Sequence, residues 1–230
     1  MKLIEVSIQY HKELNPKLWN GMDLKPEVRA KLLEIAKAFI KYLDIPDFEP
    51  MDITMTGSSA NYNWTSKSDI DLHLITRQSK HGCREVTIEL FDAKKDIFAS
   101  RFDIKIYGIP VELYVQDHKE PHVSSGTFSV LKNEWIHEPR YHKPHYNEKE
   151  VSEKTKYIKN KIDKVLKDDA GYTAAKTLMK KIKAYRQAGL EESGEFSEEN
   201  ITFKTLRLSG YLEKLKKYMQ QTRSEELSLK

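Results

Sequence analysis

The feature that most constrains the fold is the stretch 69–76, in which polar and apolar residues alternate. Successive side chains of a β-strand point to opposite faces. One face carries Asp69, Asp71 and His73, and the other carries Ile70, Leu72 and Leu74. We expect the apolar face to enter the core. Adjacent carboxylates on one strand face repel each other, so the polar face predicts a bound cation or full hydration.

A second strand, 51–56, precedes this one and ends at Gly57. A glycine at a strand end lets the backbone come close to a ligand, and the following turn can point N–H groups at phosphate oxygens. Ser58 adds a hydroxyl donor. Magnesium prefers hard oxygen ligands, commonly one or two carboxylates plus phosphate oxygens. The turn and the Asp69-x-Asp71 pair together predict a site for a metal and a triphosphate.

A later hairpin can supply a third acid. Segments 102–107 and 111–115 alternate, with a turn expected at residues 108–110. Pairing that keeps both apolar sets in the core places Glu112 on one face with Asp103, Lys105 and Tyr107. A two-metal site needs a further oxygen ligand near the attacking hydroxyl. We expect Glu112 to provide it, with Asp103 as the alternative.

This set of residues resembles the nucleotidyltransferase superfamily of the DNA polymerase beta type. The resemblance covers residues 50–117 and rests on Gly57-Ser58, Ala60, Ser68-Asp69-Ile70-Asp71-Leu72 and Val111-Glu112-Leu113. The family includes tRNA CCA-adding enzymes, poly(A) polymerases, oligonucleotide and cyclic-dinucleotide synthases and antibiotic nucleotidyltransferases. Small bacterial members usually have Arg-Gly where this chain has Asn61-Tyr62.

The resemblance implies roles for the individual residues. Asp69 and Asp71 would bind two Mg²⁺ ions, or Mn²⁺, and Glu112 would complete the catalytic metal site as a ligand and a possible base. Gly57 and Ser58 would hold the β- and γ-phosphates of a nucleoside triphosphate, and Ser59 and Ser68 are further candidates. The acceptor hydroxyl would attack the α-phosphorus, and pyrophosphate would leave.

The rest of the chain predicts an α+β fold, in which helices pack on a small mixed or antiparallel sheet and a helical C-terminal region follows. Helical periodicity is found at 26–45 and 84–100, the latter with Val86, Leu90, Ala93 and Ile97 on one side. A small hairpin is expected at 127–136. Three further helices follow, with an acidic loop at 189–197. We expect a nucleotidyltransferase domain at 1–140 and a helical domain at 148–230.

The helical part is basic. Residues 148–230 hold 19 Lys and Arg against 14 Asp and Glu, a net charge of about +5. This favours RNA, such as a tRNA 3′ end, as acceptor, and solvated lysine-rich helices are the alternative. Lys180 and Lys204 are candidates to contact phosphate, as is Lys67 beside the acids. An oligonucleotide or cyclic-nucleotide synthase, protein or small-molecule nucleotidylation, and an inactive binding module remain open.

Three residues near the acids have two interpretations each. His73 is a candidate to contact the nucleotide or acceptor, or to act as a hydrogen-bonding histidine. Tyr62 and Trp64 are candidates to stack on a base or to pack under the loop. The chain has no apolar run of membrane-spanning length, no signal-peptide pattern at its start, and one cysteine, Cys83. A cytoplasmic protein is therefore expected.

Overall fold

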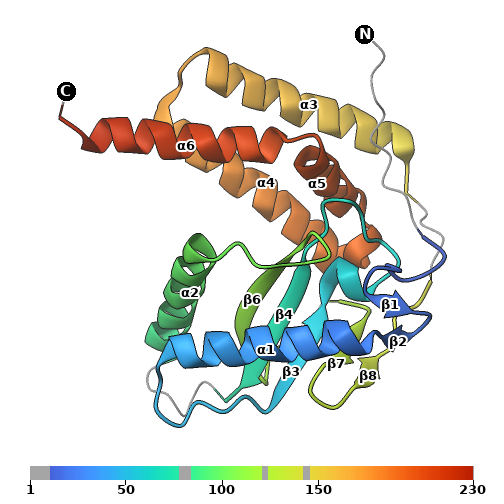
Figure 1. Ribbon diagram of the computed structural model, residues 1–230. Helices are drawn as coiled ribbons and strands as arrows, with labels where there is room; N and C mark the ends of the chain where they lie inside the picture. The colour runs from blue at the N-terminus through green and yellow to red at the C-terminus, as the bar shows by residue number, and fades with distance from the viewer. Residues whose placement is uncertain (1–10, 78–83, 121–123, 142–145, 230) are drawn as a thin grey trace. The chain divides into compact units, whose positions relative to one another are not determined.

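The computed structural model describes residues 11–77, 84–120, 124–141 and 146–229. The described residues divide into two compact units: those of 11–141, here called the sheet unit, and those of 146–229, here called the helical unit (Figure 1). The fold class is α+β, as predicted, with a mixed sheet followed by a helical C-terminal region.

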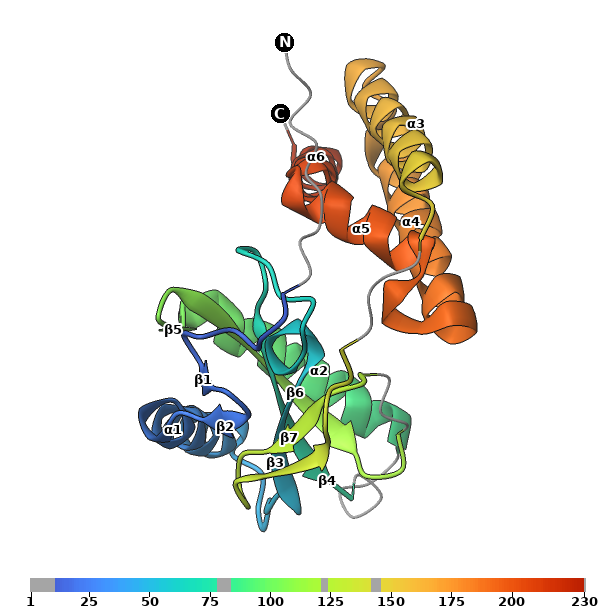
Figure 2. The same ribbon diagram turned by 90° about the vertical axis from the view of Figure 1, so that its right-hand side faces the viewer.

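The sheet unit is built on a six-stranded sheet with the order β5-β6-β4-β3-β7-β8. The strands are β3 (Asp52–Thr56), β4 (Ile70–Thr76), β5 (Lys105–Ile106), β6 (Ile109–Asp117), β7 (Thr127–Ser129) and β8 (Glu134–His137). The neighbouring strands β4 and β6 are parallel, and the other pairs are antiparallel. Figure 2 shows β3, β4, β6 and β7 side by side. A small hairpin, β1 (Trp19–Asn20) with β2 (Asp23–Leu24), precedes the sheet.

Two helices, α1 (Pro26–Leu43) and α2 (Arg84–Arg101), share one core with the sheet. Pro26 opens α1, where its missing N–H costs nothing, and Asp44 closes it in the left-handed conformation at φ 50°. The buried set includes the alternating apolar residues of the strands, namely Met55, Ile70, Leu72, Leu74 and Leu113. The sequence prediction of which face of β4 is buried is therefore confirmed.

The predicted apolar side of α2 was wrong. Val86, Leu90 and Ile97 are exposed, and the helix instead buries Phe91 and Phe98. A phenylalanine removes more apolar area from water than a valine or an isoleucine does. The two phenylalanines therefore decide which side of α2 is buried, although the smaller apolar residues are more numerous on another side.

The hairpin before Glu112 also differs from the prediction. Its turn lies at Tyr107 and Gly108, both with positive φ (50° and 81°), as the two central residues of a type I′ hairpin require. Ile109 and Pro110, which were expected in the turn, already belong to β6. The partner strand β5 is only two residues long, so Asp103 precedes it.

The helical unit contains α3 (Glu148–Lys167), α4 (Gly171–Ser193), α5 (Glu198–Leu208) and α6 (Tyr211–Leu227). Its core includes Ile162, Leu206 and Leu215. The acidic loop predicted at 189–197 was wrong in its first part, because α4 continues to Ser193 and ends at Gly194 (φ 73°). Glutamates are good helix formers, and glycine readily adopts the positive φ with which α4 ends.

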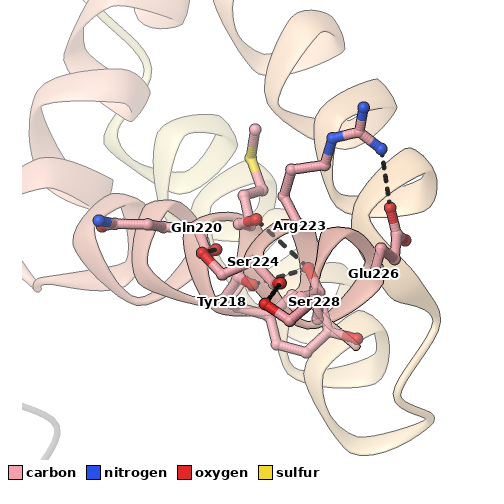
Figure 3. A network of polar contacts seen from close by, with 8 residues as sticks. Tyr218, Gln220, Arg223, Ser224, Glu226 and Ser228 are labelled. Atoms are coloured by element: carbon pink, nitrogen blue, oxygen red, sulfur yellow. Dashed lines mark hydrogen bonds and ion pairs between the residues drawn. The ribbon is translucent and has the colours of Figure 1, made fainter. Parts of the chain in front are cut away.

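In the C-terminal half of α6, polar side chains form hydrogen bonds with groups of the same helix (Figure 3). The hydroxyls of Thr222, Ser224 and Ser228 donate to carbonyls one turn earlier, at 2.7 to 2.8 Å. Arg223 pairs with Glu226 at 3.1 Å. This part of α6 therefore carries local contacts along a single helix. Among the described residues, no helix has the length and apolar character that crossing a membrane requires.

Candidate functional site

Gly57 lies directly after β3 and opens a short 3₁₀ turn, Gly57–Ala60. Its φ of 71° is in the left-handed region that favours glycine. A Cβ atom at this position would lie 1.9 Å from Oδ2 of Asp71. Glycine is therefore required twice here, once for the backbone conformation and once because the Asp71 carboxylate occupies the space that any side chain would fill.

The strand register aligns the acids. Asp71 on β4 is the register partner of Thr56 on β3 and of Glu112 on β6. Neighbouring strands are about 4.8 Å apart, so Asp71 and Glu112 are adjacent on the polar face of the sheet. Asp69 lies one residue before β4. The sequence prediction placed Glu112 on this face through its hairpin partner, and the parallel pairing with β4 brings it beside Asp71.

The charges of all three acids act on the Tyr114 hydroxyl. Its hydroxyl donates a hydrogen bond to Oε2 of Glu112 at 2.7 Å. Burial, this hydrogen bond and the negative charges of Glu112, Asp71 and Asp69 together raise the pKa of Tyr114 far above its ordinary value. The phenol therefore stays a hydrogen-bond donor, and it holds one oxygen of Glu112. The ammonium of Lys95 lies 4.4 Å from the centre of the Tyr114 ring.

His73 continues the polar face beside Tyr114, with 4.8 Å between the ring centres. Its Nδ1 lies 2.6 Å from Oε1 of Gln116, and its Nε2 lies 3.3 Å from Oγ1 of Thr56. The amide oxygen of Gln116 can only accept. We therefore assign the ring proton to Nδ1, which leaves Nε2 to accept from the Thr56 hydroxyl. Both ring nitrogens take part in hydrogen bonds, in agreement with a hydrogen-bonding histidine.

The serines of the turn form a small network. The Ser58 hydroxyl donates to Oγ of Ser68 at 2.8 Å, and the same Ser68 oxygen accepts from the Thr65 N–H at 2.8 Å. The fully buried Ser59 hydroxyl donates to the carbonyl of Asp69 at 2.5 Å. Ser59 and Ser68 thus tie the turn to the segment that carries the acids, and Ser58 is the more accessible of the three.

The loop after the turn is anchored by its polar and aromatic residues. Asn61 is buried, its amide donates to Oγ of Ser125 at 2.6 Å, and its carbonyl oxygen accepts the Tyr62 N–H at 2.8 Å. Tyr62 lies edge-on to Tyr141. The Trp64 ring stacks on the His11 ring, and the Trp64 indole N–H donates to the carbonyl of Glu13 at 3.0 Å. These contacts agree with packing under the loop.

The lysine candidates belong to different units: Lys67 to the sheet unit, and Lys180 and Lys204 to the helical unit. Lys67 is an exposed residue of the loop before Asp69. Lys180 is exposed on α4, and Lys204 is half-buried on α5 of the helical unit. Phosphate contacts by these lysines stay predictions. Asp103, the alternative third acid, is exposed and pairs with Lys105 at 2.5 Å.

Three functional candidates escaped the sequence interpretation: Thr56, Tyr114 and Gln116. The signal that could have found them is the same alternation that identified the acids. Glu112, Tyr114 and Gln116 are two residues apart on β6, and Thr56 is the register partner of Asp71. A complete strand pairing, rather than the acids alone, predicts this polar layer.

The donor set fits a hard divalent cation. Asp69, Asp71 and Glu112 offer only carboxylate oxygens, the ligand type that Mg²⁺ prefers. The space left by Gly57 keeps the Asp71 carboxylate against the turn. Within the described ranges, no three His, Cys, Asp or Glu side chains form a preformed metal cluster. Magnesium commonly uses one or two carboxylates and takes its other ligands from substrate phosphates and water.

The fold and the site define an α+β protein in which Asp71 and Glu112 are adjacent on the polar face of a mixed sheet, with Asp69 just before β4 and a glycine-serine turn beside Asp71. Comparisons of the chain with protein-family models, with curated proteins and with solved structures found no match. The functional argument therefore depends on the chain's own residues.

Proposed function

We propose that the protein is a metal-dependent nucleotidyltransferase with the nucleotidyltransferase fold of the DNA polymerase beta type. It would transfer a nucleoside monophosphate from a nucleoside triphosphate to a hydroxyl of RNA and release pyrophosphate. The observation that carries the proposal is the position of Asp71: its carboxylate lies against Gly57 and next to Glu112 on the parallel strand. This single residue connects the phosphate-binding turn to the third acid.

The fold proposal has separate support. A glycine-serine turn joins β3 to β4, the Asp69-x-Asp71 pair lies at the start of β4, and Glu112 lies on β6. This order of a turn, a pair of acids and a third acid on a later strand is the pattern implied by the family resemblance. The antiparallel pairing of β3 with β4 brings the turn back beside the acids.

In the proposed mechanism, the N–H groups of the Gly57 turn and the Ser58 hydroxyl bind the β- and γ-phosphates. Asp69, Asp71 and Glu112 would hold two magnesium ions, which supply charge neutralisation and lower the pKa of the attacking hydroxyl when bound. Glu112 would lie on the acceptor side and accept the proton of the attacking hydroxyl. Tyr114 fixes the direction of the Glu112 carboxylate through their hydrogen bond. Most of the catalysis is then positioning and charge stabilisation.

The test is pyrophosphate release from each of the four labelled nucleoside triphosphates with Mg²⁺, with and without total RNA, followed by mass analysis of the products. Asp69→Asn with Asp71→Asn, and Glu112→Gln alone, should each lower the rate by about a hundredfold or more. Asp103→Asn is the matched control, because it removes an exposed carboxylate from the neighbouring hairpin. It should retain activity.

Each outcome has a defined meaning. Loss of activity in Asp103→Asn but not in Glu112→Gln would assign the role of third acid to Asp103 in place of Glu112. Product formed without RNA would replace RNA addition by an oligonucleotide or cyclic-nucleotide synthase, and labelled protein or small molecules would name those acceptors. Absence of pyrophosphate with every nucleotide and acceptor, together with nucleotide binding that survives the Asp substitutions, would favour a binding module and overturn the enzyme proposal.

A further inference from the structure

The helical unit carries an exposed tyrosine surrounded by lysines. Tyr157 on α3 is 52% exposed. The ammonium of Lys161, one turn further along α3, lies 4.5 Å from the centre of the Tyr157 ring, and that of Lys154 lies 5.7 Å from it. Lys181, on α4, adds its charge from the neighbouring helix. We call these four residues the Tyr157 cluster.

The Tyr157 cluster differs in its charge from the surroundings of Tyr211 in the same unit. Lys159 and Lys214 lie 5.0 and 4.6 Å from the Tyr211 ring, but the Tyr211 hydroxyl donates to Asp163 at 3.1 Å. A carboxylate therefore offsets the lysines there. At Tyr157 the charges of Lys161, Lys154 and Lys181 act on the phenol.

The electrostatic consequence supports this contrast. A hydrogen bond and charge from Lys161, with the charges of Lys154 and Lys181, lower the pKa of Tyr157 below its ordinary value. Burial and nearby carboxylates raise the pKa of Tyr211 and Tyr218 instead. The lysine charges close to the Tyr157 ring therefore favour an anion at this surface.

The chemistry of the cluster selects the type of anion. Lysines attract phosphates as point charges. An exposed aromatic ring offers a platform for an unpaired base, and this stacking is tolerant of sequence. A positive surface with an exposed ring matches the two requirements of a single strand, which presents phosphates and unstacked bases together. A double helix hides its base faces and would use only the lysines.

The cluster also has a visible limit. Lys154 lies 4.7 Å from the ring of Tyr185 on α4 as well. Around Tyr185 the nearby charges include the carboxylates of Glu199, Glu198 and Glu150. The positive surface therefore ends at Lys154 on this side and extends along α3 towards Lys161.

We propose that Tyr157, Lys154, Lys161 and Lys181 form a binding surface for single-stranded RNA, with the ring stacking on a base and the lysines contacting the flanking phosphates. The choice of RNA rests on the proposed function, in which RNA supplies the acceptor hydroxyl. Strand binding itself does not depend on catalysis.

The experiment uses the full chain with Asp69→Asn and Asp71→Asn, so that strand binding is measured without transfer. The probe is a fluorescein-labelled 20-nucleotide oligo(U), followed by anisotropy between 50 and 300 mM salt. Adding Lys154→Gln, Lys161→Gln and Lys181→Gln should weaken binding about tenfold or more, and it should reduce the salt slope by about 2, because a single strand contributes about 0.7 per neutralised phosphate.

The matched control is Lys159→Gln, Lys214→Gln and Lys217→Gln, which removes the same net charge from the same unit. Its affinity for oligo(U) should change by less than about threefold. Tyr157→Ala should weaken binding by about tenfold, whereas Tyr157→Phe, which keeps the ring, should stay near the parent value.

Equal losses in the two triple variants would overturn the proposal, because net charge alone would then explain binding. Equal effects of Tyr157→Ala and Tyr157→Phe would overturn the stacking role. Tighter binding of oligo(dT) than of oligo(U) would overturn the assignment to RNA. A failure of nucleotidyl transfer leaves these measurements unchanged, so the two proposals fail separately.

Discussion

Replacing Gly57 by alanine tests the closest contact of the proposed site. The new Cβ would lie 1.9 Å from Oδ2 and 3.0 Å from Cγ of Asp71. Atoms cannot remain at these distances, so the Asp71 carboxylate must turn away from the strand end. We expect a moderate loss of stability and a large loss of transfer activity, because the displaced group is a proposed metal ligand.

The expected loss of stability has two parts. Holding a residue with a Cβ at φ 71° costs about 1–2 kcal/mol. Moving the short Asp71 side chain from its preferred rotamer costs about 0.5–1.5 kcal/mol more. Together these predict about 1.5–3.5 kcal/mol. Gly21 is the matched control: its φ is 60°, and a Cβ there would meet nothing within 4 Å. Gly21→Ala should therefore show only the first part.

A double-mutant cycle separates the two parts. In the Asp71→Ala background, Gly57→Ala no longer collides with a carboxylate, so its cost should fall to about that of Gly21→Ala. The coupling free energy should be about 0.5–1.5 kcal/mol. All three tryptophans of the chain, Trp19, Trp64 and Trp135, belong to the sheet unit. Urea unfolding followed by tryptophan fluorescence therefore reports on this unit.

Two results would refute the reasoning. If Gly57→Ala costs no more than Gly21→Ala, and the cycle gives no coupling, then the Asp71 carboxylate does not lie against the turn. If Gly57→Ala retains full transfer activity at the same magnesium concentration, then Asp71 either keeps its position or has no part in the reaction.

Three further predictions concern the same unit and use the same urea and fluorescence measurement. Ser68→Ala should cost about 1–3 kcal/mol, because the buried hydroxyl accepts the Thr65 N–H, which loses its partner; an unchanged midpoint would contradict this role. Asn61→Ala should cost a similar amount, about 1–3 kcal/mol, since its amide both donates and accepts in the loop; a loss below about 0.5 kcal/mol would argue against it. Burial and the Glu112 carboxylate raise the pKa of Tyr114, so above pH of about 10 the folded state keeps a proton that the unfolded state loses, and stability should fall as pH rises. In metal-free buffer Tyr114→Phe should reduce this slope by up to about 1.4 kcal/mol per pH unit; parallel curves between pH 9 and 11 for the two proteins would contradict it.

Short-range patterns predicted the elements of the fold whose signals agree with one another. Pro26 and helical spacing marked α1, and strict alternation marked β4 and its buried face. The prediction was wrong where two signals competed. In α2 the stripe of smaller residues competed with Phe91 and Phe98, and only the sheet decides which side is covered. At 108–110, a proline suggested a turn, although the left-handed pair Tyr107 and Gly108 had already formed one.

The same distinction explains what the sequence reveals of the candidate site. Gly57 and the two aspartates were found because a turn residue and a repulsive pair are visible in one short stretch. The hydrogen bond between His73 and Gln116 depends on the parallel register of β4 and β6, whereas the one from Tyr114 to Glu112 joins two residues of β6. A residue that binds substrate or metal must be of a particular chemical type. A residue that only positions such a ligand can be of several types, provided that its side chain contacts the ligand. Tyr114 is therefore invisible to a search for catalytic residue types, yet it lies two residues from Glu112 on β6 and directs the third acid through their hydrogen bond.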